Sequence, residues 1–297
     1  MEPIIYFVNR RPDLWEHLAQ MKHPPLPSEI DLPLLKTNAT LHWTVQTYLH
    51  LRRHGANVCL SASIRPDAIN VVHYDDLGWK RLPFRSFVVA IQADRARPEI
   101  ADMRIVQNHL CIRNEMTDFY IPFWTQPGLQ PRDCSRGQRL ERLAYYGLEV
   151  YLAPAFRSES FRTALEKLGI SLEVRANPDQ WTDYSQTDAV LAIRQTTDYV
   201  LSIKPPTKLL NAFRAGCIPI LGPEPAYHQV AIPGEDYFEA SNPEQVILLR
   251  PFISLSKLAA LCFTTLNRSN GLIENQPIEN LGQQGWGTHN EALAIGG

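Results

Sequence analysis

The stretch KPPTKLLNAFRAGCIPILGPEPAY, residues 204–227, decides the fold of this chain. Pro206 and Gly216 bracket a helix that we predict over residues 207–215, because proline suits the first turn of a helix and glycine its C-terminal cap. The apolar run 217–221 predicts a buried strand, and 223–229 a short helix. Upstream, DAVLAIR at 188–194 predicts another buried strand. Strand, helix and strand in this order predict a βαβ unit of a parallel sheet.

The same alternation of strands and helices extends outward over both halves of the chain. In the second half we predict strands at 143–147 and 170–174 and helices at 158–169, 243–250 and 255–263. In the first half we predict strands at 4–8, 58–61, 69–73, 87–93 and 103–106 and a helix at 41–53. These patterns predict an α/β fold with a first domain at residues 1–140, a second at 141–264 and a polar tail at 265–297.

Composition restricts the class of protein. The 297 residues hold 29 Lys+Arg and 31 Asp+Glu, and a net charge of −2 argues against an obligatory nucleic-acid binder. The five cysteines form no CxxC, which favours reduced thiols and a cytoplasmic location. No stretch approaches 18 apolar residues, and residues 4–8 resemble a strand more than a signal peptide. A peripheral contact with a membrane stays open.

Four arginines lie near the predicted domain boundary, at spacings of four, three and three residues: Arg132, Arg136, Arg139 and Arg142. These spacings would place them on one face of a helix. The stripe is compatible with a solvated linker and with a contact to phosphate or anionic lipid.

Three cations surround the predicted start of the helix at 207–215. Arg194 ends a strand, Lys204 lies in the following loop, and Lys208 lies in the first turn of the helix. Because a helix N-terminus carries a partial positive charge, lysine is unfavourable there unless an anion lies nearby. The cluster therefore predicts a phosphate site, although Asp198 or Glu224 can also pair with these cations.

The run from Lys204 to Glu224 resembles the donor-binding region of glycosyltransferases of the GT-B fold, with a C-terminal domain like that of glycosyltransferase group 1, family 4. The resemblance implies two Rossmann-like domains that face each other across a cleft. It implies a nucleotide-sugar donor whose diphosphate binds the three cations and whose hydroxyls bind Glu224. Asn211 and Tyr227 lie in the same run, and Gly147 would allow close approach of the backbone to the donor.

The implied activity is metal-independent transfer of a hexose from a nucleotide-diphosphate sugar to a hydroxyl of a saccharide, lipid or protein. No cofactor is implied beyond this co-substrate. Retaining members usually carry a second glutamate about eight positions from the first, whereas this chain has Gly216 and Ile232 there. The stereochemical outcome therefore stays open.

The first half would bind the acceptor. His73 ends a buried strand and can act as a base, with Asp75 or Asp76 orienting it, and His42 is a weaker candidate. The pair Asp75-Asp76 alternatively suggests a manganese site, which in single-domain glycosyltransferases is spaced Asp-x-Asp. The alternative function is a non-catalytic module that binds a nucleotide or sugar.

Overall fold

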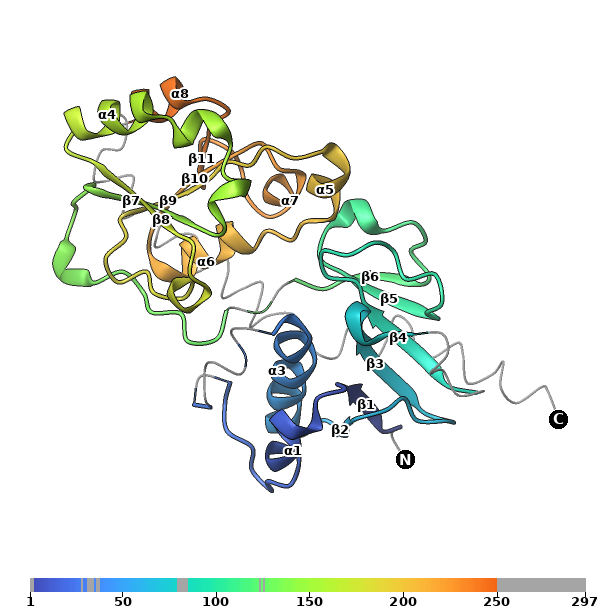
Figure 1. The fold of residues 1–297 in the computed structure, drawn as a ribbon. Coiled ribbons are helices and arrows are strands. Elements are labelled where there is room, and N and C mark those ends of the chain that lie inside the picture. Colours follow the sequence, from blue (N-terminus) through green and yellow to red (C-terminus); the bar gives the residue numbers. More distant parts are fainter. Residues whose placement is uncertain are drawn as a thin grey trace.

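The computed structural model describes residues 3–27, 29–30, 35, 38–78, 85–122, 124 and 126–249, which carry two parallel sheets (Figure 1). The first sheet has the order β2-β1-β3-β4-β5-β6. Its strands are β1 (Ile5–Val8), β2 (Val58–Ser61), β3 (Ile69–His73), β4 (Phe87–Ile91), β5 (Met103–Val106) and β6 (Asp118–Tyr120). The second sheet has the order β11-β10-β9-β7-β8. Its strands are β7 (Arg142–Tyr146), β8 (Ser171–Arg175), β9 (Ala189–Ala192), β10 (Ile218–Leu221) and β11 (Phe238–Glu239).

The two sheets share one topology. The first strand of each half pairs in parallel with both the second and the third, and later strands add beyond the third. In such a doubly wound sheet the second strand lies on one side of the first strand and the third strand on the other. The place where the strand order reverses is the switch point, and ligands bind beside it at the carboxyl edge of the sheet. The switch points lie between β1 and β3 in the first half and between β7 and β9 in the second.

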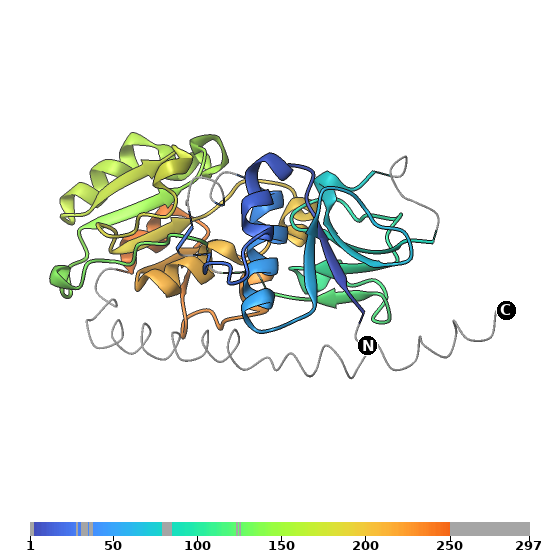
Figure 2. The same cartoon turned by 90° about the horizontal axis from the view of Figure 1, so that it is seen from below.

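Helix α3 (Ala39–Arg53) covers the first sheet and lies on its side toward the second half (Figure 2). It begins at Asn38, whose side-chain oxygen accepts the backbone N–H groups of Thr40 and Leu41. The core between helix and sheet includes the fully buried Val45 and Leu49. Helix α1 (Pro12–Ala19) adds Trp15 and Leu18 to the same core.

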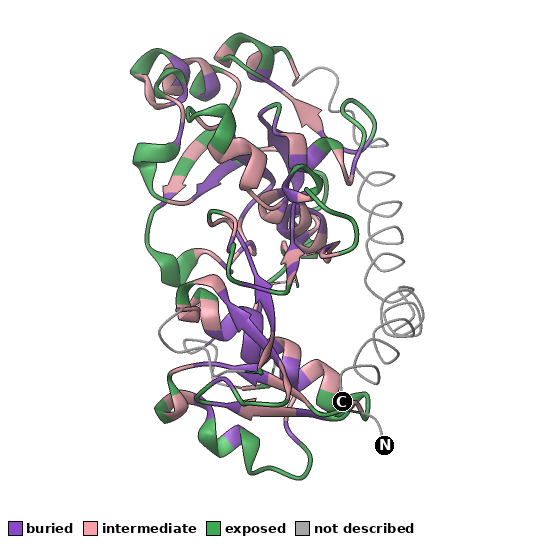
Figure 3. Ribbon diagram, turned by 90° about the vertical axis from the view of Figure 1, so that its right-hand side faces the viewer, coloured by how far each residue is buried: buried purple, intermediate pink, exposed green. Residues whose placement is uncertain are grey.

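The helices of the second half flank its sheet, and buried residues follow the strands (Figure 3). They are α4 (Glu159–Lys167), α5 (Asp198–Ile203), α6 (Thr207–Ala215), α7 (Pro225–His228) and α8 (Pro243–Leu248). Helix α6 confirms the prediction at 207–215, and Gly216 ends it in the left-handed conformation, at φ 68°. Ser158 caps α4 through the N–H of Phe161. The predicted helix at 255–263 and the tail at 265–297 lie outside the described residues.

The prediction that the four arginines share a helical face is wrong. Residues 134–136 form a single 3₁₀ turn and Arg142 begins β7. No helix therefore spans the four arginines, and their spacing does not place them on one face. The buried carboxylate of Asp188 instead binds Arg132 at 2.8 Å and Arg136 at 2.8 Å. These bonds, with two backbone N–H groups, hold the pKa of Asp188 at about 2 despite its burial. The segment before the second sheet is thereby tied to the start of β9.

Polar contacts join the loops at the carboxyl edges of the two sheets. Asn108, fully buried after β5, donates to Lys204 O at 3.1 Å and accepts from the Gln229 side chain at 2.8 Å. Gln229 in turn accepts the backbone N–H of His109 at 3.0 Å. Lys204 Nζ lies 2.6 Å from Asp94 Oδ2, which follows β4. The two halves therefore contact each other through their ligand-binding edges.

Candidate functional site

The carboxyl edge of the second sheet gathers most of the predicted donor-binding side chains. Gly147 directly follows β7, Arg194 follows β9, and Glu224 follows β10. Tyr227 lies in α7 and Lys208 in the first turn of α6. The parallel topology brings these positions together because strand ends that are distant in sequence meet at one edge.

Glu224 and Tyr227 form the buried centre of this edge. The Glu224 side chain is 2% exposed, and its Oε1 lies 3.3 Å from Arg194 Nε. The Tyr227 hydroxyl interacts with both Glu224 and Arg194, although neither Glu224 oxygen forms a hydrogen bond of good geometry among the described residues. Burial raises the pKa of Glu224, while the Arg194 charge opposes this rise. A buried carboxylate has about four acceptor positions, so Glu224 keeps capacity to accept hydrogen bonds from the hydroxyls of a polar ligand.

Lys208 points its ammonium group across the start of α6 toward the end of β7. Its Nζ donates to the backbone oxygen of Tyr146 and lies 5.7 Å from the centroid of the Trp181 ring. Burial, and secondarily the Arg194 charge, lower the pKa of Lys208 to about 7. The helix N-terminus adds to this effect, since Pro206 provides no side-chain cap. An anion that binds beside Lys208 would stabilise the charged form of this lysine and raise its pKa.

Two predicted donor-binding residues make other contacts. Lys204 pairs with Asp94 of the first half, and Asn211 donates to Gln126 Oε1 at 2.7 Å. Gln126 lies in the segment that connects the two sheets. Lys204 thus links the two halves, and Asn211 links α6 to the connecting segment. Their roles in binding a donor stay predictions.

Gly147 has a conformation that only glycine adopts easily. Its φ is +149°, and a Cβ there would lie 3.3 Å from the hydroxyl oxygen of Tyr145. The backbone at the end of β7 therefore lies close to a buried aromatic ring that also borders Arg194 and Glu224. Close approach of the donor itself stays a prediction.

The predicted acceptor-side residues lie at the switch point of the first sheet. His73 is fully buried, its Nδ1 accepts the backbone N–H of Asp75 at 3.1 Å, and burial lowers its pKa to about 4. The neutral ring therefore carries its proton on Nε2 and is arranged as a donor. The Asp75 carboxylate binds Arg95 at 2.8 Å, whereas it lies 3.8 Å from His73 Nδ1. A role of His73 as base requires the other tautomer and stays a prediction.

Three residues that join the halves are not among the predicted site residues. Asp94, Asn108 and Gln229 make these contacts, and each lies in a loop or short helix after a strand end. A usable signal was available, because a polar residue just after a buried parallel strand marks the carboxyl edge. The partner of each residue cannot be inferred this way, since it belongs to the other half.

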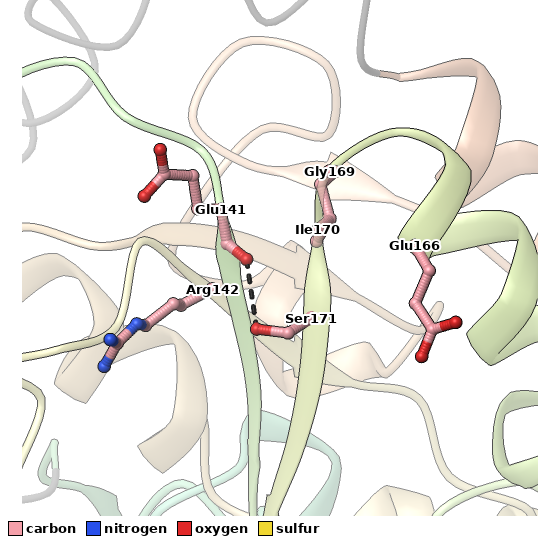
Figure 4. Close-up of a pocket in the computed structure, with 6 residues that line it drawn as sticks. All are labelled: Glu141, Arg142, Glu166, Gly169, Ile170 and Ser171. Carbon is pink, nitrogen blue, oxygen red and sulfur yellow. Dashed lines mark hydrogen bonds between the residues drawn. The ribbon is translucent and has the colours of Figure 1, made fainter.

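Other features of the described residues do not form a second candidate centre. No group of three or more His, Cys, Asp or Glu side chains in this part of the chain could hold a metal ion. None of the helices described there is long and apolar enough to cross a membrane. An open hollow of about 340 Å³ lies at the amino ends of β7 and β8 (Figure 4), the edge opposite to the ligand-binding edge. It is lined by Glu141, Arg142, Glu166, Gly169, Ile170 and Ser171.

Comparisons with known proteins place this geometry in a known fold. No family model and no curated protein matches the chain. Among solved structures, it is similar to AviGT4, a glycosyltransferase involved in avilamycin A biosynthesis, with a TM-score of 0.50 and 12% identity over 92% of this chain and 99% of that one. An α1,3-fucosyltransferase matches with a TM-score of 0.46 and 11% identity over 88% of this chain and 80% of that one. The pneumococcal O-GlcNAc transferase GtfA, solved with UDP and GlcNAc, matches with a TM-score of 0.43 and 12% identity over 63% and 51%.

The similarity to AviGT4 covers nearly the whole of both chains. At this identity it shows a shared fold. It supports the predicted α/β architecture, which the structure shows as two parallel sheets.

Proposed function

We propose that this chain is a glycosyltransferase that moves a sugar from a nucleotide-diphosphate sugar to a hydroxyl acceptor. The observation that carries the proposal is the buried Glu224 carboxylate, which lies 3.3 Å from Arg194 at the carboxyl edge of the second sheet and forms no hydrogen bond of good geometry among the described residues. A buried carboxylate is costly unless its acceptor capacity is used, and one cation and one hydroxyl leave part of that capacity unused. Hydroxyls of ribose or of the donor sugar would supply further donors.

The cations of the same edge suit the diphosphate. Arg194 keeps its charge at any physiological pH, and Lys208 gains a full charge when an anion arrives. Together with the uncapped start of α6 they would stabilise the negative charge that develops on the departing diphosphate. This electrostatic role needs no metal ion, in keeping with the metal-independent transfer that we predict.

The first half would hold the acceptor opposite the donor, with a cleft between two Rossmann-like domains. The contacts of Asp94 and Asn108 with the second half support this arrangement, since they join the two carboxyl edges. Saccharide, lipid and protein hydroxyls are the acceptors considered, and we propose action in the cytoplasm.

Thermal-shift measurements with a panel of nucleoside diphosphates and their sugars test the donor site. A ligand that binds only the folded chain raises its melting temperature. We expect a shift with at least one nucleotide, its loss in Lys208→Ala and Glu224→Gln, and its retention in the exposed controls Lys167→Ala and Glu166→Gln. Absence of a shift with every nucleotide refutes the proposal, and survival of the shift in both site variants refutes the assigned residues.

The second candidate function is a module that binds a nucleotide or sugar without transfer. The hydrogen bond that His73 Nδ1 accepts favours it, because this tautomer leaves the ring without a free acceptor nitrogen for a base. Incubation of the wild-type chain with the donor that binds separates the two candidates. Release of nucleoside diphosphate with transfer or hydrolysis supports the enzyme, whereas binding without turnover supports the module.

A further inference from the structure

The carboxyl edge of the first sheet carries buried polar groups that the proposed donor site does not use. His73 ends β3, Gln92 directly follows β4, Gln107 directly follows β5, and Tyr120 ends β6. His73, Gln92 and Gln107 are at most 2% exposed. Four neighbouring strands thus each end in a polar side chain, and the strand register places His73 and Gln107 on one face of the sheet and Gln92 and Tyr120 on the other.

Each of these side chains has hydrogen-bonding capacity left over. No partner among the described residues reaches His73 Nε2, Gln92 Oε1, the Tyr120 hydroxyl, or either polar atom of the Gln107 carboxamide. Gln92 uses only its amide nitrogen, which donates to Arg95 O at 2.9 Å. Buried polar atoms are nearly always satisfied, so the unsatisfied atoms of His73 and Gln107, which share one face at the carboxyl edge, indicate a missing polar ligand.

The charged groups around this edge neutralise one another. Asp75 binds Arg95 at 2.8 Å, Arg95 binds Asp94 at 2.8 Å, and Asp94 binds Lys204 at 2.6 Å. Two acids and two bases therefore form one chain of ion pairs. Burial keeps His73 neutral at pH 7, because it lowers the pKa of the ring to about 4. The groups that remain available are neutral donors and acceptors.

Resting on the proposed function, we propose that the acceptor is a neutral saccharide bound by Gln107 and His73. A carboxamide offers one donor face and one acceptor to neighbouring hydroxyls, and the His73 Nε2–H adds a donor. An alkyl chain would leave these groups unsatisfied, and an anionic acceptor would need a cation that is not already paired.

The position of Gln107 agrees with an acceptor role. Its neighbour Asn108 is hydrogen-bonded to Lys204 and Gln229 of the second half, so Gln107 lies where the two carboxyl edges meet. His73 pairs with Ile91 of β4, and Ile91 with Ile105, two residues before Gln107. The His73 and Gln107 Cα atoms are thus about 12 Å apart, from strand spacing and rise, and one or two sugar rings can contact both side chains.

The test measures thermal shifts of the full chain with millimolar neutral methyl glycosides, including disaccharides, with 1-octanol and with a serine-containing peptide. We expect a glycoside to raise the melting temperature, and Gln107→Met to weaken its binding about tenfold or more, as loss of a buried hydrogen-bonding group predicts. Gln107→Met should itself fold, since Gln107 forms no hydrogen bond within the described part of the chain. His73→Phe is the second variant, and the exposed Gln180→Met is the control.

The outcomes separate this proposal from the donor-site proposal. Glycoside binding that is lost in Gln107→Met and kept in Glu224→Gln supports an acceptor site. Glycoside binding that is kept in Gln107→Met and lost in Glu224→Gln assigns the glycoside to the donor site and overturns the acceptor-site proposal. A shift with octanol or the peptide but with no glycoside overturns the saccharide assignment while the nucleotide shifts stand. Wild-type glycoside affinity in both Gln107→Met and His73→Phe overturns it as well. If no nucleotide raises the melting temperature, the donor-site proposal fails independently of the glycoside result.

Discussion

Replacing Lys208 with methionine should remove a pH dependence from the stability of the chain. Burial lowers the pKa of Lys208 from 10.5 to about 7 in the folded state. Between these two pH values the unfolded chain holds a proton at this lysine that the folded chain has released. Stability of the wild type should therefore rise with pH across this window, and its gain should be lost as pH falls toward 7. Methionine binds no proton and removes this dependence.

The expected change in the free energy of unfolding follows from the same pKa of Lys208. A full difference of one bound proton changes the free energy of unfolding by 1.36 kcal/mol per pH unit. For a lysine that is half protonated at about pH 7 when folded, this gives about 2 kcal/mol between pH 7 and pH 9. Because Lys208 keeps some exposure to water, which screens its charge, we expect about 1 kcal/mol.

The assay is urea unfolding of wild type and Lys208→Met at pH 7, 8 and 9. Other titrating groups act equally on both proteins, so the difference between the two curves isolates Lys208. The relative stability of the wild type should increase by about 1 kcal/mol over this range. Lys167→Met, at an exposed lysine in the last turn of α4, should stay parallel to the wild type. Parallel curves for Lys208→Met would refute the assignment of a desolvated lysine at the start of α6.

Three further predictions concern ligand binding and packing. Binding of a nucleoside diphosphate at pH 8 should take up part of a proton, because the anion raises the pKa of Lys208. Titration calorimetry in Tris and in HEPES should therefore give binding heats that differ between the two buffers. Equal heats contradict a diphosphate at this lysine. Asp188→Asn should lower the free energy of unfolding by about 3 kcal/mol, since it leaves the buried guanidinium of Arg136 without its carboxylate; a loss below about 1 kcal/mol in urea unfolding speaks against this anchor. Gly147→Ala should cost about 1–3 kcal/mol through its φ of +149° and the nearby Tyr145 hydroxyl, and an unchanged melting temperature would show that the end of β7 relaxes freely.

Local sequence patterns determined the elements of this fold. Pro206 and Gly216 bracket helix α6 at the predicted bounds, because the fixed φ of proline and the left-handed freedom of glycine act on the backbone alone. Most apolar runs became strands within one or two residues of the prediction, because a short apolar run bounded by turn residues suits a buried parallel strand. The short elements α1, α5, β6 and β11 were not predicted, since tertiary contacts outweigh weak local preferences there.

The four arginines show where a local pattern misleads. Their spacing suited a helix, yet the segment forms only a single 3₁₀ turn, and the buried Asp188, about fifty residues later, binds two of the arginines. Charge pairing over such a separation leaves no trace in periodicity. The same holds for Lys204, whose predicted partner was a phosphate and whose partner in the structure is Asp94.

For the candidate site, the sequence by itself determined the chemistry available: cations before and within a helix start, and an acid after the next strand. Only the tertiary structure decided which of these groups keep free hydrogen-bonding capacity. It left the Gln107 carboxamide without a hydrogen bond among the described residues and placed Glu224 against Arg194 with acceptor capacity to spare, while it paired Lys204 and bound Asn211 to the connecting segment. The physical reason is that burial and pairing depend on which strand ends the parallel topology brings to one edge, and those strands come from distant parts of the chain.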